Sequence, residues 1–243
     1  MLFYALMSPA VTILVIYILA AILPAVFLMR YIYSQDKYEP EPGNLLWSLV
    51  LSGVAAALVS ILLESVGETV LSKFVSEDSP DYSIILAFLV VAVVEEGTKF
   101  FFLKRKTWNN PNFNFRYDGV VYAVFVSLGF AAFENVEYVF RYGLSVVASR
   151  ALLAIPAHMG FAVFMGSFYG RAKICEARGD RTGKTLNLLA GYLVAVFLHG
   201  FYDSTAMIGT SQSMWMFVAF VIIMYIVVYN KIKSESRNDK PIY

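Results

Sequence analysis

The sequence is short of charged residues and of cysteine. Charged residues make up 15% of the 243 positions, whereas soluble domains carry about 25%. The formal net charge is only +1, so the chain offers no strongly basic surface of the kind that binds nucleic acid. Its one cysteine, Cys175, excludes an intramolecular disulfide and a cysteine-rich metal cluster. These absences argue against a soluble, disulfide-stabilised or nucleic-acid-binding domain.

Long apolar stretches take the place of charge. Hydrophobic residues make up 59% of the chain, and the mean hydropathy is +0.64. An apolar helix of about 20 residues crosses the roughly 30 Å hydrocarbon core of a bilayer, and only a helix satisfies its own backbone there. The sequence therefore predicts an all-α, polytopic transmembrane bundle that forms one domain over residues 1–243. We expect about seven spans, near residues 9–32, 45–66, 82–103, 117–140, 146–170, 185–207 and 213–230.

Basic residues in the connectors predict the orientation of the bundle. Most of the 19 lysines and arginines lie between spans one and two, three and four, or five and six, or in the C-terminal tail. Lys73, Arg141 and Arg150 fall near the other side. Because cytoplasmic connectors are rich in Lys and Arg, we expect the N-terminus outside and the C-terminus in the cytoplasm.

Ionisable residues inside the third span are the first functional candidates. Glu95, Glu96 and Lys99 lie well within its apolar sequence. A charge near the centre of a membrane helix costs roughly 2.5–3.5 kcal/mol on insertion scales, so such residues are usually functional. Lys99 lies one helical turn after both glutamates and can pair with either.

Three later spans add polar residues at similar depth. These residues are Glu134 and Asn135 in span four, His158 in span five, and His199 and Asp203 in span six. At 1.5 Å per residue, the carboxylates and histidines occupy a band roughly 9–20 Å below the outer surface. Small residues share a helix face with His158 and with His199, which favours helix contacts over lipid contacts. The sequence thus predicts one polar cavity in the outer half of the membrane.

Simpler readings of these residues exist. The Glu–Lys group can be an ion pair that only stabilises the bundle. A histidine can be a hydrogen-bonded core residue, and Asp203 can merely orient His199. Glu137 is expected at the membrane interface. The joint composition favours chemistry, because carboxylates with two imidazoles at one depth are what water activation or divalent-metal ligation requires.

The ordered motifs resemble a known family. These motifs are EExxK (Glu95, Glu96, Lys99), FxxxEN (Phe130, Glu134, Asn135), a mid-membrane His158 and HxxxD (His199, Asp203). Together they resemble the PrsW family of bacterial intramembrane proteases, distant relatives of the CAAX prenyl endopeptidases and of bacteriocin-processing enzymes. The resemblance covers residues 82–207. Two departures from the CAAX branch, the lysine at Lys99 and the glutamate at Glu134, both suit the PrsW branch.

The resemblance implies a function in the bacterial cell membrane. It implies a multi-pass site-1 protease that cleaves a single-span anti-sigma factor on its extracytoplasmic side and so starts a stress response. The lipid bilayer and that membrane protein are then the partners, and nucleic acid is not.

The residues themselves suggest how water would be activated. Since no serine or cysteine lies beside a histidine in a catalytic pattern, we expect Glu95 or Glu96 to act as general base, with Lys99 setting their charge. Glu134, His158, His199 and Asp203 would bind a zinc-like divalent metal, or act without one by polarising the scissile carbonyl. Both versions stay open. The alternatives from other classes are an ion- or proton-coupled transporter and a non-catalytic scaffold of the same fold.

Overall fold

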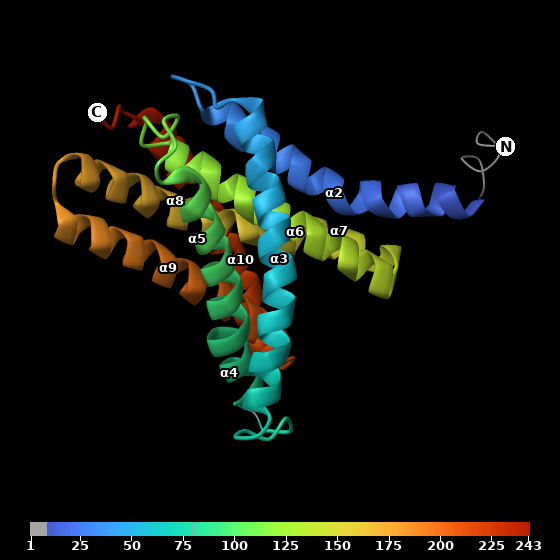
Figure 1. Ribbon diagram of the computed structural model, residues 1–243. Coiled ribbons are helices and arrows are strands. Elements are labelled where there is room, and N and C mark those ends of the chain that lie inside the picture. The colour runs from blue at the N-terminus through green and yellow to red at the C-terminus, as the bar shows by residue number, and fades with distance from the viewer. Residues whose placement is uncertain (1–8, 80) are drawn as a thin grey trace.

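The computed structural model describes residues 9–79 and 81–243 as a bundle of helices (Figure 1). Within these residues the only β pairing is an isolated bridge between Phe115 and Pro241. The helices are α2 (Pro9–Gln35), α3 (Gly43–Leu71), α4 (Tyr82–Ile85), η1 (Leu86–Ala92), α5 (Val93–Thr107), α6 (Asp118–Tyr142), η2 (Leu144–Val146), α7 (Val147–Ser149), η3 (Arg150–Ala154), α8 (Ile155–Ala177), α9 (Arg181–Met207) and α10 (Ser211–Arg237). The all-α prediction is confirmed.

The helices reproduce the predicted spans. Six of them are long and apolar enough to cross a membrane by length and composition. The seventh is the continuous stretch α4–η1–α5, residues 82–107, whose apolar sequence is interrupted by Glu95, Glu96 and Lys99. Residues 1–8 of the predicted domain lie outside the described residues.

One predicted connector is shorter than expected. Residues 171–177, which we expected in the connector between spans five and six, continue α8. Lys173 donates to the carbonyl oxygen of Trp108 at 2.8 Å and to Glu176 at 2.8 Å. These bonds satisfy the charged side chains of the extra helical turns, so the helix extends past its apolar segment.

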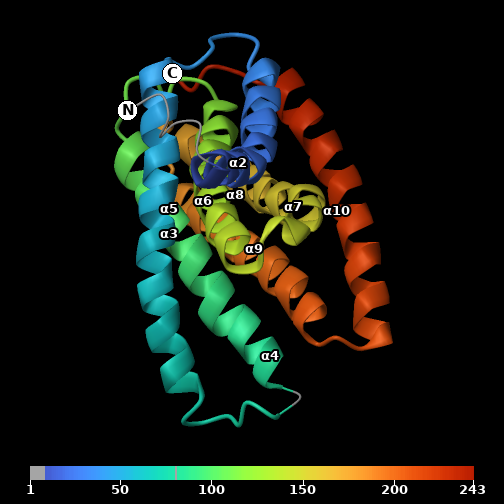
Figure 2. The same ribbon diagram turned by 90° about the vertical axis from the view of Figure 1, so that its right-hand side faces the viewer.

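Helix α6 is the centre of the bundle. In its most apolar 18-residue window 83% of the residues are buried, against 11% in α2. Helices α2, α3 and α8 pack around it (Figure 2). Large apolar side chains such as Phe27 and Leu62, each 70% exposed, point away from the bundle. In a membrane protein this apolar exterior is the surface that lipid covers.

Glycines bring α3 close to α6. A methyl group on Gly129 would overlap the carbonyl oxygen of Val50, and one on Gly53 would overlap that of Val126. Small residues permit such backbone contact between membrane helices. The crossing fixes how α3 is rotated, and therefore which of its side chains reach the interior.

Both membrane prolines have neighbours that accommodate them. Proline lacks an N–H and cannot donate to the carbonyl four residues earlier; for Pro156 that carbonyl belongs to Leu152. The Tyr225 hydroxyl of α10 donates to it, and the chain just before Pro156 forms the π-helical turn η3. Helix α2, which contains Pro24, is bent along its length (Figure 1), and the Asn135 side chain donates at 2.7 Å to the carbonyl oxygen of Ala21, three residues before Pro24.

The predicted basic connectors meet at one end of the bundle, which we call the basic end: residues 35–43, 104–118, 171–184 and 231–243 (Figure 1). Lys233 donates to Gln35 at 3.1 Å, and Arg116 pairs with Glu235 at 2.6 Å. The C-terminal tail continues this contact through the bridge of Phe115 with Pro241. Connectors distant in sequence are thereby held together.

Candidate active site

A π-helical turn precedes the glutamate pair. Helix η1 changes to α5 just before Glu95, and such π turns often mark functional sites. Both glutamates and Lys99 are buried. The Lys99 ammonium lies 2.9 Å from Glu95 Oε2 and 2.8 Å from Glu96 Oε1, and 4.0 Å from the centre of the Phe130 ring. One lysine therefore bridges two carboxylates in an apolar surrounding.

Lys99 and Glu134 together orient His158. Lys99 Nζ lies 3.2 Å from His158 Nδ1, and His158 Nε2 lies 3.0 Å from Glu134 Oε2. An ammonium can only donate, so Nδ1 accepts and Nε2–H donates to the carboxylate. In this tautomer the Nδ1 lone pair points at the Lys99 ammonium, which bridges the two glutamates.

His199 contacts carboxylates through both ring nitrogens. Nδ1 lies 2.9 Å from Glu96 Oε1, and Nε2 lies 3.1 Å from Asp203 Oδ2. Glu95 Oε2 is farther, at 3.9 Å from Nε2. The ring of Phe161 stacks on the imidazole with centroids 5.0 Å apart. His199 is thus held between Glu96 and Asp203, with one carboxylate at each ring nitrogen.

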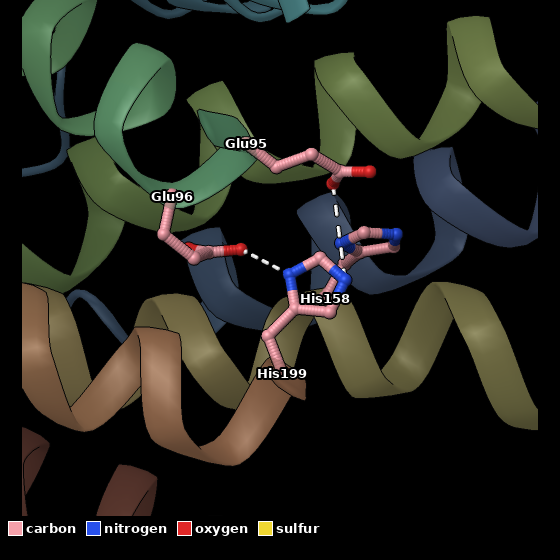
Figure 3. A group of neighbouring side chains, drawn as sticks. All are labelled: Glu95, Glu96, His158 and His199. Atoms are coloured by element: carbon pink, nitrogen blue, oxygen red, sulfur yellow. Dashed lines mark hydrogen bonds and ion pairs between the residues drawn. The ribbon is translucent and has the colours of Figure 1, made fainter. Parts of the chain in front are cut away.

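Four of these side chains form a cluster that can hold a metal ion. Figure 3 shows Glu95, Glu96, His158 and His199 pointing toward one another from α5, α8 and α9. One donor atom from each lies within 4.8 Å of the others. Two imidazoles and two carboxylates are a ligand set that zinc accepts. Glu96 Oε2 is buried without a hydrogen-bond partner among the described residues. The donors present therefore fit a divalent metal.

A cavity of about 490 Å³ lies beside the cluster. Its walls come from α3, η1, α5, α6, the η3–α8 segment and α9. Residues near the ends of these helices, including Arg141 and Met207, also line it. These helix ends lie opposite the basic end (Figure 2). The cavity thus opens at the end of the bundle that has few basic residues.

The structure brings most of the predicted residues together. Glu95, Glu134, His158, His199 and Asp203 line the cavity. Glu96 and Lys99 lie directly behind them, in contact with His199 and His158. Of the residues named as metal ligands, the two histidines belong to the four-residue cluster. Glu134 and Asp203 contact the outward nitrogens of those histidines.

Asn135 lies elsewhere. It is buried, donates to Ala21 of α2 and accepts from Arg150 Nε at 2.8 Å, and it does not line the cavity. Glu137 lies at the cavity mouth, where it pairs with Arg141 at 2.9 Å. Its side chain is 37% exposed.

Four charged residues of the cavity wall, Glu64, Glu68, Arg141 and Arg150, were not among the predicted site residues. Glu64 of α3 lines the cavity, and its Oε1 is buried without a hydrogen-bond partner among the described residues. Arg150 lines it too, and pairs with Glu134 at 3.0 Å. The signal for Glu64 was present in the sequence, because it is a carboxylate inside an otherwise apolar span.

The chain matches the family model described as PrsW family intramembrane metalloprotease over residues 41–229. The matched region contains every candidate site residue. No solved structure matches the chain.

Named relatives agree with the family model. The Protease PrsW of Clostridioides difficile (strain 630) is 31% identical over 229 residues, which cover 93% of each chain. The Protease PrsW of Geobacillus kaustophilus (strain HTA426) is 30% identical, with 91% of this chain and 93% of that protein covered. That of Bacillus subtilis (strain 168) is 30% identical over 85% of this chain and 88% of its own length. The likeness extends over nearly the whole of each protein.

Proposed function

The chain belongs to the PrsW family of intramembrane proteases, and we propose that it carries out site-1 cleavage of a single-span membrane regulator such as an anti-sigma factor. It is a multi-pass bacterial membrane protein and a peptide hydrolase. We propose further that residues 1–243 act as one protease domain, and that the peptide bond is cut in the cavity beside the Glu–His cluster.

The side of cleavage follows from the two ends of the bundle. The basic end carries most lysines and arginines, which favours the cytoplasm for that end. The cavity opens at the other end. With the C-terminus in the cytoplasm and the N-terminus outside, the cavity faces the extracytoplasmic flank of a substrate helix. An anti-sigma factor cut there loses its outer part while its cytoplasmic part stays anchored.

Glu95 is the proposed general base. It lines the cavity, whereas Glu96 lies behind it and is completely buried. Water in the cavity therefore reaches the Glu95 carboxylate first. The Lys99 ammonium lies 2.9 Å from that carboxylate and pairs with it. Glu96 has a different role, since its Oε1 accepts from both Lys99 and His199 and so fixes their positions.

The histidines complete the proposed chemistry. Of the four clustered residues, Glu96, His158 and His199 would hold a zinc-like metal, which when bound supplies Lewis-acid polarisation of the water and the scissile carbonyl, while Glu95 stays free to accept the proton of the water. Glu134 and Asp203 orient the two imidazoles, as carboxylates do around metal sites. Glu95, once it has taken the proton of the water, is placed beside the cavity to return that proton to the leaving amine.

The observation that carries this proposal is the cluster of two glutamates and two histidines on the wall of a cavity within the family's matched region. The test uses purified full-length protein and a single-span reporter of known orientation, with the cut mapped by mass spectrometry. We expect cleavage in the extracytoplasmic flank of the reporter. A chelator should stop it, and added zinc should restore it.

Two results would contradict the proposal. A cut in the cytoplasmic flank would refute the orientation and the side of cleavage together. The second result is full activity after exhaustive chelation, when elemental analysis finds no metal in the purified protein. The mechanism would then need no metal, and the role of Glu95 as general base would be tested by the activity of Glu95→Gln.

A further inference from the structure

Two carboxylates of α3, a helix that carries none of the motifs, face the cavity. Glu64 and Glu68 are four residues apart, so they lie on one face of the helix, and both line the cavity. Glu64 Oε1 is buried, while Glu68 is exposed toward the mouth. Neither belongs to the motifs that identify the family resemblance.

The other carboxylates of the cavity have cationic or histidine partners. Glu95 pairs with Lys99 at 2.9 Å, Glu134 with Arg150 at 3.0 Å and Glu137 with Arg141 at 2.9 Å. Asp203 pairs with His199 at 3.1 Å. Among the described residues, Glu64 and Glu68 form no ion pair. The α3 wall therefore carries two carboxyl groups that no cation of the described residues pairs with.

The lack of a partner matters most for Glu64, because its Oε1 atom is buried. A carboxylate oxygen that is buried without a hydrogen bond loses its hydration and gains nothing in return. The basic side chains nearest the cavity, Arg141, Arg150 and Lys99, are already engaged by the carboxylates named above. A basic side chain that enters the cavity would supply the missing donor.

We propose that Glu64 and Glu68 form a subsite that binds a lysine or arginine side chain of the substrate close to the scissile bond. The proposal rests on the proposed protease function and adds a specificity to it. A long basic side chain fits the geometry, because its charged group reaches the buried Glu64 while its stem passes Glu68 at the mouth. The partner is thus a membrane-protein segment with a basic residue at the membrane boundary.

The experiment compares matched reporters. Each position flanking the mapped cleavage site is changed in turn to Lys, Gln or Glu, and kcat/KM is measured with purified full-length enzyme. At one position we expect the Lys reporter to be cleaved roughly 10–100-fold faster than the Gln reporter, the range typical of a hydrogen bond between charged groups. The Glu reporter should be the slowest of the three.

Substitution then assigns the preference to α3. In Glu64→Gln the Lys-to-Gln ratio should fall to about 1, and Glu68→Gln should lower it less, because Glu68 is exposed to water. Glu64→Lys should reverse the preference in favour of the Glu reporter. Glu137→Gln, also at the mouth but paired with Arg141, is the matched control and should keep the wild-type ratio.

Each failure has a distinct meaning. If wild-type enzyme cleaves no reporter, the proposed function fails. If it cleaves Lys and Gln reporters equally at every position, the subsite is refuted and the protease function stands. An equal loss on all reporters in Glu64→Gln, with thermal stability retained, would also refute the subsite, since Glu64 would then act in the chemistry itself.

Discussion

Carboxylates are buried at both ends of this bundle, but the groups around them differ. At the basic end Glu235 accepts from Arg116 at 2.6 Å and from Ser167 at 2.6 Å, and Asp118 accepts from the backbone N–H groups of Asn114 and Phe115. At the other end Glu95, Glu134 and Asp203 surround two histidines beside an open cavity. The first group ties connectors together, and the second faces a space that a substrate can enter.

The difference teaches how to read a buried acid in a membrane protein. Burial alone does not mark a catalytic group, since Glu235 and Glu95 are almost equally inaccessible, at 4% and 6%. What separates them is the neighbouring space and the presence of imidazoles. A carboxylate whose partners are all fixed within the chain holds structure, whereas one that also borders a cavity can exchange a proton with water.

The largest expected effect comes from removing the proposed base. Glu95→Gln keeps the size of the side chain but cannot accept a proton, so kcat should fall about 10²–10⁴-fold. Thermal stability in detergent should change little, because Lys99 keeps its contact with Glu96 at 2.8 Å. Activity is measured on the mapped reporter, with Glu137→Gln as the control that keeps most of it. Full activity in the Glu95→Gln/Glu96→Gln double variant would leave the mechanism without a base.

The opposite end should respond in the opposite way. Glu235→Gln leaves Arg116 and Lys231, 2.6 and 3.2 Å from Glu235, without their anionic partner. Breaking a buried ion pair in this way typically costs about 3–5 kcal/mol. We expect a clearly lower melting temperature in detergent, with kcat per folded molecule near that of the wild type.

The exposed pair of Glu137 and Arg141 is again the control, since exposed pairs contribute only about 0–1 kcal/mol. The comparison of the two ends would break down if Glu235→Gln lost activity at unchanged stability. Glu235 would then act on the cavity from the far end of the bundle.

Much of this arrangement could be predicted because charge in an apolar helix is a clear signal. Glu95, His158 and His199 had to face the interior, and their depths placed them together. Asn135 shows the limit of that reasoning. It follows Glu134 directly, yet one residue turns a helix by about 100°, so Asn135 points to α2 and Arg150 while Glu134 points to the cavity.

The contribution of α3 could not be predicted by depth. Glu64 lies two residues inside the predicted end of its span. A carboxylate at that depth is as compatible with the lipid headgroup region as with the interior of the bundle. Its direction depends on how α3 is rotated, which the crossing of Gly53 and Gly129 determines. The π-helical turns η1 and η3 leave no mark in hydrophobic periodicity, although both precede site residues.

Asp36 and Glu41, in the connector between α2 and α3, are exceptions at the basic end. Both are buried, and neither Asp36 oxygen has a hydrogen-bond partner among the described residues. Burial raises the pKa of Asp36 from 3.8 to about 6, with a further contribution from the nearby Asp239 and Glu39. Burial likewise raises the pKa of Glu41 from 4.5 to about 7, although the hydroxyl of Tyr122 donates to it at 2.7 Å.

These raised pKa values predict the smallest of the effects, a pH dependence of stability. Between about pH 4 and pH 7 the folded chain binds more protons at Asp36 and Glu41 than the unfolded chain does. Stability conferred by these two groups is therefore greatest at low pH and falls as the pH rises through about 6 and 7. Melting temperatures in detergent at pH 5.5 and 8 should differ in that direction for the wild type. The difference should shrink in Asp36→Asn/Glu41→Gln, while Glu39→Gln, on an exposed neighbour, should keep most of it. If the double variant kept the full difference in melting temperature, groups other than Asp36 and Glu41 would cause the pH dependence. The connector between α2 and α3 would then contribute nothing to it.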